Sequence, residues 1–253
     1  EGNTNIQVVR KLSLGGTTVC FDGLRSGSID LYPEYDGTAY TIHLGHTERI
    51  RDPAMVYSAV KREFEQRFQM TWTAPFGFNN YFALAMPQPL AQQYGIRTVS
   101  QLAPLSNRFV FGTTNEFMGR PLDGYVPLAA TYGLQFRAVR TMMTGLRYNA
   151  IQANDIQVMD AYATDAKLRT FNLLLLEDDK GFFPPYNGAM IIRTDTLANH
   201  PELLNLINRL GGTMNNELVR SLNYRVEVLG QGLEEVARDF LRSHGLVPTP
   251  GPG

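Results

Sequence analysis

The sequence predicts an α/β fold, arranged either as two lobes or as one large domain. Short apolar segments of strand length alternate along the chain with segments of helical periodicity, which is the pattern of an α/β protein. The chain has 253 residues, a length that exceeds what a single hydrophobic core usually contains. No internal repeat is evident.

The amino-terminal part is expected to alternate strands with two amphipathic helices. The helix that starts at Asp52-Pro53 has the clearest signal, because Asp can cap a helix and proline suits its first position. An apolar stripe of Val56, Val60, Phe64 and Phe68 then follows on one face of it. The other expected elements are a helix over Thr17–Ser26 and extended segments at Ile6–Val9, Ile29–Tyr32, Trp72–Phe76 and Tyr81–Met86.

The remainder of the chain continues the alternation. Strands are expected at Phe109–Phe111, Ile156–Asp160, Leu173–Leu176 and Ala189–Ile192. Helices are expected from Thr113 onward and at Pro89–Tyr94, Leu128–Tyr132, Thr144–Asn154, Thr164–Arg169, Pro201–Leu210 and Leu233–Ser243. The proline- and glycine-rich residues 248–253 are expected to form a disordered tail.

Composition excludes several classes of function. The net charge is −1 and the basic residues are scattered, which argues against a nucleic-acid partner and against electrostatic binding to a membrane surface. No apolar run approaches the roughly 18–20 residues that span a bilayer, and no signal peptide is visible. Cys20 is the single cysteine, so the chain forms no internal disulfide.

The sequence carries no recognisable catalytic or metal-binding motif, so we expect neither an enzyme nor a cofactor. His43 and His46 are close in sequence but have no suitable third metal ligand nearby. Ser28 lacks the glycine context of a hydrolase nucleophile. The segment 15–17 lacks the remaining glycines and the lysine of a phosphate-binding loop, so a helix-entry turn explains it better.

Aromatic residues that follow turns or strand ends are the strongest functional signal. An aromatic face at a cleft attracts a poorly solvated organic cation, and rings held by proline turns lose little entropy when a ligand binds. Each ring alone is better explained by packing, but their shared position at strand ends favours binding. The residues concerned are Tyr35 after Pro33-Glu34, Tyr81-Phe82 after Asn79-Asn80, Tyr162 after Asp160-Ala161, and Tyr186 after two prolines.

Several longer motifs resemble one known family. Residues 27–38 (GSIDLYPEYDGT) resemble the signature GxIDxYPEYxGT of the substrate-binding proteins of osmoprotectant ABC importers, the glycine betaine/choline/carnitine family. Further segments are similar to motifs of the same family, namely 77–86 (GFNNYFALAM), 145–151 (GLRYNAI), 158–165 (VMDAYATD) and 176–186 (LEDDKGFFPPY). The resemblance covers nearly the whole chain.

The resemblance implies a two-lobed periplasmic-binding-protein fold of type II with two hinge crossings. Together with the turn-rich segments, it places lobe I at residues 1–76 and 181–253 and lobe II at 77–180. The family's first strand and helix are expected to be absent, because the chain starts at what resembles the second strand. An aromatic box around a trimethylammonium group is also implied, and by position it consists of Tyr35, Phe82, Tyr162 and Tyr186.

The chain departs from the family pattern at several expected site positions. Phe82 keeps an aromatic face where many relatives have Tyr, and Tyr81 adds a phenol beside it. Asn187-Gly188 stands where relatives often have Tyr-Ala, which adds an amide to the expected site. Asp36 replaces a common Thr and is expected to bring a carboxylate near the ligand.

Polar residues near the expected cleft leave two explanations open. If the cargo carries a carboxylate, the guanidinium of Arg147 is suited to bind it; the alternative is a structural ion pair with Asp160, Asp165 or Glu116. Residues 113–115 head a helix and either offer N–H groups to an anionic end of the ligand or cap the helix. The expected ligand-binding residues are Tyr35, Asp36, Thr38, Asn79, Tyr81, Phe82, Asn115, Arg147, Tyr162, Tyr186 and Asn187.

Three functions remain open on the sequence. The preferred one is a non-catalytic protein that captures a quaternary-ammonium or zwitterionic solute and passes it to an ABC permease, on the periplasmic or extracytoplasmic face of a bacterial membrane. It would be lipid-anchored, fused to the permease or free. The second keeps the fold but binds an amino acid or another polar metabolite, because Asn187 makes the box less aromatic. The third is a sensor domain or an enzyme of unknown class.

Overall fold

The structure of the chain, a computed structural model, describes residues 2–247. The chain divides into two compact units. The first contains the residues up to His46, Asp52–Asn79 and the residues from Pro185 onward, and the second contains Thr47–Arg51 and Asn80–Pro184. The expected tail at 248–253 lies outside the described residues.

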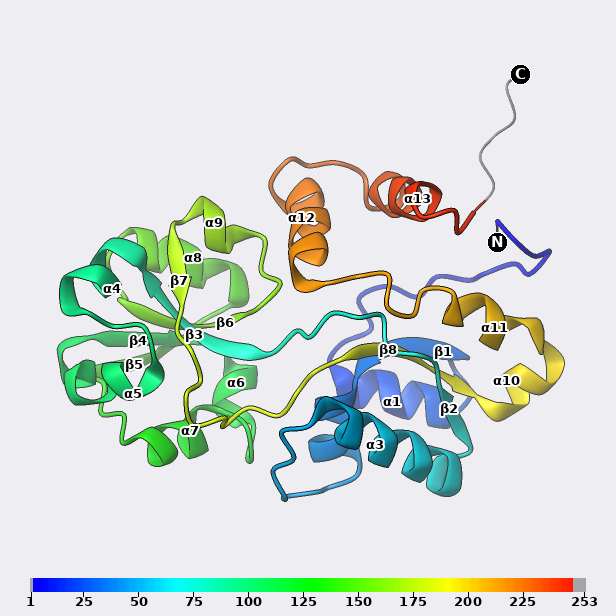
Figure 1. The fold of residues 1–253 in the computed structure, drawn as a ribbon, viewed down its shortest axis with the longest axis horizontal. Coiled ribbons are helices and arrows are strands. Elements are labelled where there is room, and N and C mark those ends of the chain that lie inside the picture. The colour runs from blue at the N-terminus through cyan, green and yellow to red at the C-terminus, as the bar shows by residue number, and fades with distance from the viewer. Residues whose placement is uncertain (1, 248–253) are drawn as a thin grey trace. The chain divides into compact units, whose positions relative to one another are not determined.

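The first unit is built on a small antiparallel sheet. Its strands β1 (Leu31–Tyr35), β8 (Gly188–Arg193) and β2 (Met70–Trp72) lie in the order β1-β8-β2, and both outer strands run antiparallel to β8. The helix α1 (Thr17–Arg25) contacts β1, and α3 (Pro53–Phe68) contacts β2 (Figure 1).

The core of the first unit forms between these helices and the sheet. Asp52 caps α3 as expected, because its side chain accepts a hydrogen bond from the N–H of Ala54 at 2.9 Å. Three of the four apolar side chains on the predicted face of α3 are fully buried, and the fourth, Phe68, is partly exposed. The buried side chains of this core include Leu24, Val56, Val60, Phe64, Trp72 and Ile191.

Two short helical segments directly follow β1. They are α2 (Asp36–Thr38) and the π-helical η1 (Ala39–His43). In η1 the N–H of Leu44 donates to the carbonyl of Ala39 at 3.0 Å, which is the five-residue spacing of a π turn. Such turns are rare and occur frequently at functional sites.

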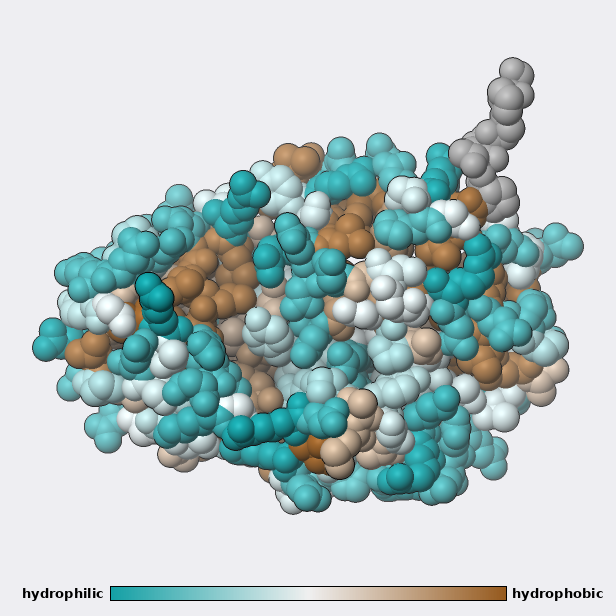
Figure 2. Space-filling model, viewed as in Figure 1, coloured by the Kyte–Doolittle hydropathy of each residue, from teal (hydrophilic) through white to brown (hydrophobic). Residues whose placement is uncertain are grey.

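Helices complete the first unit at its carboxy-terminal side. They are α10 (Thr194–Asn199), α11 (Glu202–Asn208), α12 (Asn216–Glu227) and α13 (Leu233–Ser243), the last with the bounds that the sequence predicts. Figure 2 shows apolar side chains gathered near the turn between α12 and α13, where Val228 and Leu229 are exposed.

The second unit contains a mixed sheet in the order β5-β4-β6-β3-β7. The central strand β6 pairs in parallel with β4 and antiparallel with β3. The edge strand β5 is parallel to β4, and the edge strand β7 is antiparallel to β3. The strands are β3 (Phe82–Pro87), β4 (Val110–Thr113), β5 (Ala138–Thr141), β6 (Val158–Tyr162) and β7 (Leu173–Leu175).

Short helices connect the strands of the second unit. One core cluster there joins residues of α8, β4 and β6, including Ile151, Val110 and Met159. The helices are α4 (Gln88–Tyr94), α5 (Val99–Leu102), the 3₁₀ helix η2 (Ala103–Arg108), α6 (Asn115–Gly119), α7 (Tyr125–Tyr132), α8 (Thr144–Gln152) and α9 (Lys167–Thr170).

Some elements differ from the sequence-based expectation. The strand expected at Ile6–Val9 is wrong, because no described strand pairs with these residues. The edge strand β5 was not predicted, since most of its residues are exposed and it shows no apolar alternation. The helix α12 was also missed, and none of its residues is buried.

Candidate functional site

Tyr35 closes β1 and carries the first of the expected site rings. It is partly exposed, and the ring of Phe78 packs edge-on against it with the centroids 6.3 Å apart. The backbone N–H of Tyr35 donates to Oε1 of Glu34 at 2.7 Å. The strand end therefore presents an aromatic ring with part of its surface accessible, and Phe78 supports it.

Asp36 and Asn187 bind each other in the first unit. Asp36 is 0% exposed, and its Oδ1 accepts the backbone N–H groups of Gly37 and Asn187, each at 2.7 Å. Its Oδ2 accepts the side-chain amide of Asn187 at 2.8 Å. Burial raises the pKa of Asp36 to about 7, although the hydrogen bonds from Asn187 and Gly37 lower it. The two departures from the family pattern are therefore partners.

Tyr186 is fixed by its neighbours and is only 1% exposed. Its backbone N–H donates to Oδ1 of Asn79 at 2.8 Å, and Asn79 is itself held by the side-chain amide of Asn216. Gly37 also allows a close approach, because a Cβ atom there would lie 2.1 Å from the carbonyl oxygen of Pro185. Any side chain at position 37 would therefore displace the segment that carries Tyr186.

Phe82 and Tyr162 form the aromatic pair of the second unit. They lie opposite each other on β3 and β6, with ring centroids 4.7 Å apart. Phe82 is 4% exposed and packs against Phe117, and the guanidinium carbon of Arg120 lies 5.1 Å from the centre of its ring. Tyr162 is partly exposed, and burial raises the pKa of its phenol. A ligand in this unit would therefore meet Tyr162 rather than Phe82.

Arg147 forms a buried ion pair with Asp160. Both side chains are 0% exposed, and Nη1 of Arg147 donates to the carboxylate and to the backbone carbonyl of Asp160. The structural ion pair with Asp160 is thus confirmed, and it engages Nη1 of Arg147 but not Nη2. One guanidinium nitrogen, Nη2 of Arg147, is buried without a hydrogen-bond partner among the described residues. Asp160 and Tyr162 alternate along β6 and so share one face of the sheet.

Helix capping accounts for part of the segment 113–115. The side-chain hydroxyl of Thr114 accepts a hydrogen bond from the N–H of Phe117 at 3.1 Å. The backbone N–H of Thr114 donates to Oδ1 of Asp160 at 3.1 Å. Asn115 is exposed in the first turn of α6. The capping explanation is therefore confirmed for Thr114.

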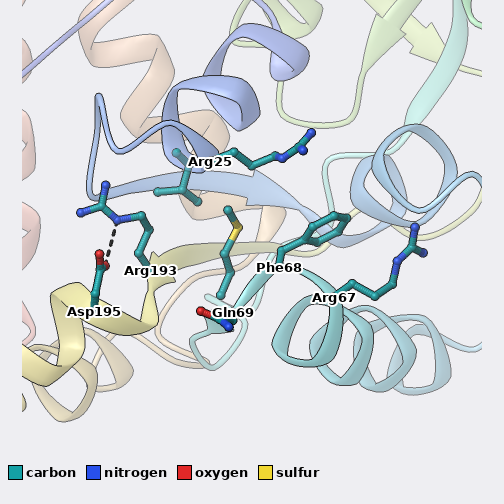
Figure 3. A pocket seen from close by; sticks show the side chains of 8 residues that line it. Arg25, Arg67, Phe68, Gln69, Arg193 and Asp195 are labelled. Atoms are coloured by element: carbon teal, nitrogen blue, oxygen red, sulfur yellow. Dashed lines mark hydrogen bonds and ion pairs between the residues drawn. The ribbon is translucent and has the colours of Figure 1, made fainter.

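A cavity of about 330 Å³ lies in the first unit, away from Tyr35. It opens at the Arg193 end of β8, whereas Tyr35 pairs with Gly188 at the other end of that strand. Figure 3 shows Asp195 facing Arg193 and the ring of Phe68 between two further arginines. The residues that line it are Leu24, Arg25, Arg67, Phe68, Gln69, Met70, Arg193 and Asp195. None of the expected ligand-binding residues is among them.

Two of the histidines, His43 and His46, take part in hydrogen bonds with acidic side chains. His46 lies 2.9 Å from Glu63, and His43 lies 3.2 Å from Glu34. Within residues 2–247, no group of three or more His, Cys, Asp or Glu side chains could hold a metal ion. The same part of the chain contains no helix that is both long and apolar enough to cross a membrane.

Comparison with known proteins identifies the family. The model of the substrate binding domain of ABC-type glycine betaine transport systems matches residues 1–243. The chain belongs to this family. Its members are solute-binding proteins of ABC transporters that act outside the cytoplasm, not enzymes.

Named relatives of this glycine betaine transport family cover most of the chain. The carnitine transport binding protein OpuCC of Listeria monocytogenes is 35% identical, over 96% of this chain and 79% of its own. The glycine-betaine-binding protein of Pseudomonas aeruginosa is 34% identical, over 92% and 77%. The ergothioneine transport permease/ergothioneine binding protein EgtU of Helicobacter pylori is 36% identical over 96% of this chain, which spans 43% of that longer protein.

Solved structures of the glycine betaine transport family agree in fold. A crystal structure described as a glycine betaine/carnitine/choline ABC transporter is 33% identical, with a TM-score of 0.79 over 92% of this chain and 85% of its own. Apo YehZ from Escherichia coli has a TM-score of 0.72 at 23% identity, over 96% and 90%. The predicted α/β fold of type II periplasmic binding proteins is therefore confirmed.

The expected site residues fall into two sets, one in each unit. Thr38 is buried in α2 beside Asp36, and Tyr81 is exposed directly before β3. Sequence reasoning missed Phe78 and Arg120, which contact Tyr35 and Phe82 respectively. Phe78 lies inside the family-like motif at residues 77–86, whereas nothing in the sequence points to Arg120. The first-unit set is Tyr35, Asp36, Thr38, Asn79, Tyr186 and Asn187, and the second-unit set is Tyr81, Phe82, Asn115, Arg147 and Tyr162.

Proposed function

We propose that this chain binds a small quaternary-ammonium or related zwitterionic solute of the glycine betaine, choline, carnitine or ergothioneine type. In this proposal Tyr35 in the first unit and Tyr162 in the second unit are both ligand-binding residues, and Phe82 packs against Tyr162. The protein then delivers its solute to the permease of an ABC importer on the extracytoplasmic face of a bacterial membrane.

The observation that carries the proposal is the surroundings of Tyr162. Its ring is partly exposed beside Phe82, which suits a desolvated organic cation. Arg147 lies in the same unit and has a buried nitrogen, Nη2, without a partner among the described residues. A guanidinium with a spare donor is suited to the carboxylate that betaines and carnitine carry. The ring of Tyr162 thus suits the ammonium end of such a zwitterion, and Nη2 of Arg147 in the same unit suits its carboxylate end.

An amino acid or another polar metabolite is the second candidate. The observation that favoured it, the amide at position 187, has another explanation. That candidate depends on the amide of Asn187 as a polar group for the ligand. In the structure this amide donates to Asp36 at 2.8 Å. The polarity introduced at position 187 is therefore satisfied inside the protein, and the aromatic interpretation is favoured.

Titration calorimetry with glycine betaine, choline, L-carnitine and ergothioneine tests the proposed function. At least one of them is expected to bind in the micromolar range, since several desolvated aromatic and polar contacts together supply about −8 kcal/mol. Glycine and glutamine serve as controls, because they lack the trimethylammonium group. Absence of heat with all four solutes, or equally tight binding of the two amino acids, would contradict the proposal.

A further inference from the structure

Glu34 is a charged residue at an inward-facing position of β1. Burial alternates along this strand, so that Tyr32 and Glu34 face the interior while Pro33 is exposed. Glu34 is only 5% exposed. A buried carboxylate costs free energy unless its oxygens are hydrogen-bonded, and an apolar residue at this position would avoid that cost.

Both carboxylate oxygens of Glu34 are occupied. Oε2 accepts the hydroxyl of Thr17 and the phenol of Tyr32, the latter at 3.1 Å. Oε1 accepts the backbone N–H of Tyr35 at 2.7 Å. Burial and the neighbouring carboxylate of Glu34 raise the pKa of Tyr32, so its phenol remains a donor. The donors therefore come from α1 and from β1 itself.

His43 completes this group from the end of η1. Its Nε2 lies 2.9 Å from Oγ1 of Thr17 and 3.2 Å from Oε2 of Glu34. Because Thr17 donates its hydroxyl to Glu34, it is free to accept a hydrogen from Nε2. The imidazole is 3% exposed and stacks on Phe21 at a centroid distance of 4.1 Å. The π-helical turn thus carries His43 back beneath β1.

The hydrogen bonds around Glu34 extend to the backbone of Tyr35. Glu34 holds the N–H of Tyr35, and the next residue, Asp36, donates its N–H to the carbonyl of Asn187 at 3.1 Å. The ring of Tyr35 is partly exposed and packs edge-on against Phe78. The hydrogen bonds on both sides of Tyr35 therefore help to fix where its ring stands.

We propose that Glu34 is a positioning residue for solute binding, resting on the function proposed above. Its buried carboxylate, held by Thr17, Tyr32 and His43, fixes the strand end from which Tyr35 projects. Cation–π attraction depends on where the ring lies relative to the cation, and binding residues need such a supporting shell. Glu34 thus acts on the solute through Tyr35 and need not touch it.

The variant Glu34→Gln tests this proposal because it keeps the shape of the side chain but replaces one acceptor oxygen by an NH₂ group. This NH₂ group then faces the hydroxyl and N–H donors that bind the carboxylate in the wild type. Affinity for choline or glycine betaine, measured by calorimetry, is expected to fall about tenfold. In a Tyr35→Ala background the same change is expected to have no further effect, since the ring that it positions is gone. A purely structural role for Glu34 would instead leave the affinity of the folded variant unchanged in both backgrounds.

Two further variants keep the test decisive. Glu63→Gln is the matched control, because it breaks a second Glu–His contact in the same unit, 2.9 Å from His46, and is expected to leave affinity unchanged. If Glu34→Gln does not fold, Thr17→Val removes one donor to Glu34 more gently, with an expected loss of about threefold. An unchanged affinity in both Glu34→Gln and Thr17→Val would overturn the proposal.

A readout without solute separates this proposal from the proposed function. In ¹⁵N-labelled protein the amide proton of Tyr35 is expected to exchange slowly, and Glu34→Gln is expected to shift its resonance and speed its exchange. If the wild-type protein binds none of the four solutes, the proposed function fails, while this amide still reports on Glu34. If the amide of Tyr35 is unaffected by Glu34→Gln, the positioning role is wrong.

Discussion

Replacement of Asp160 by Asn is expected to destabilise the protein by about 3–5 kcal/mol, because it leaves the buried charge of Arg147 without its counter-charge. Both side chains are 0% exposed, so water cannot replace the lost partner. The Asp160 carboxylate also accepts the N–H of Thr114 ahead of α6. Chemical denaturation followed by circular dichroism measures the change in the free energy of unfolding.

An exposed ion pair in the other unit provides the control. Asp30→Asn removes the contact between Arg193 and Asp30, whose side chain is 60% exposed, and is expected to cost less than about 1 kcal/mol. The double variant Arg147→Met with Asp160→Leu is expected to recover much of the lost stability, since it removes both buried charges. An Asp160→Asn variant as stable as the wild type would show that the pair is hydrated in solution.

Replacement of Tyr35 by Ala is expected to weaken binding of a quaternary-ammonium solute about tenfold or more. The change removes a partly exposed ring at the end of β1, and one desolvated cation–π contact contributes about 1–2 kcal/mol. Tyr35→Phe keeps the π face and is expected to retain most of the affinity. Calorimetry with choline and glycine betaine checks both variants.

Tyr224 supplies the matched control for Tyr35. It lies on α12 in the same unit, is 36% exposed and belongs to neither set of expected site residues. Tyr224→Ala is therefore expected to bind like the wild type. If Tyr35→Ala also binds like the wild type while remaining folded, Tyr35 has no part in solute binding.

Local sequence signals predicted much of the fold. Asp52-Pro53 and the apolar spacing behind it indicated α3, and α13 has the bounds that were predicted for it. The strands that lead to Tyr35 and Tyr162 were also predicted, but with ends at Tyr32 and Asp160, whereas the observed strands run on to include both tyrosines. These features depend on neighbours in sequence, which is why a single sequence reveals them.

Contacts between distant residues could not be predicted in the same way. Asp36 and Asn187 are 151 positions apart, so only the folded sheet shows that each satisfies the other. The guanidinium of Arg120 over Phe82 likewise depends on how the loop after α6 packs. The burial of Glu34 also depends on partners distant in sequence, on α1 and η1.

A comparison of each cation with its uncharged carbon isostere tests the central claim most directly. The pairs are choline with 3,3-dimethylbutan-1-ol and glycine betaine with 3,3-dimethylbutanoate, which differ chiefly by nitrogen or carbon at the centre of the trimethyl group. If aromatic faces such as that of Tyr162 select a soft positive charge, the solute that binds should lose about tenfold or more in affinity when its nitrogen is replaced. Equal affinity for the isostere would contradict that account, because the pocket would then recognise only an apolar shape.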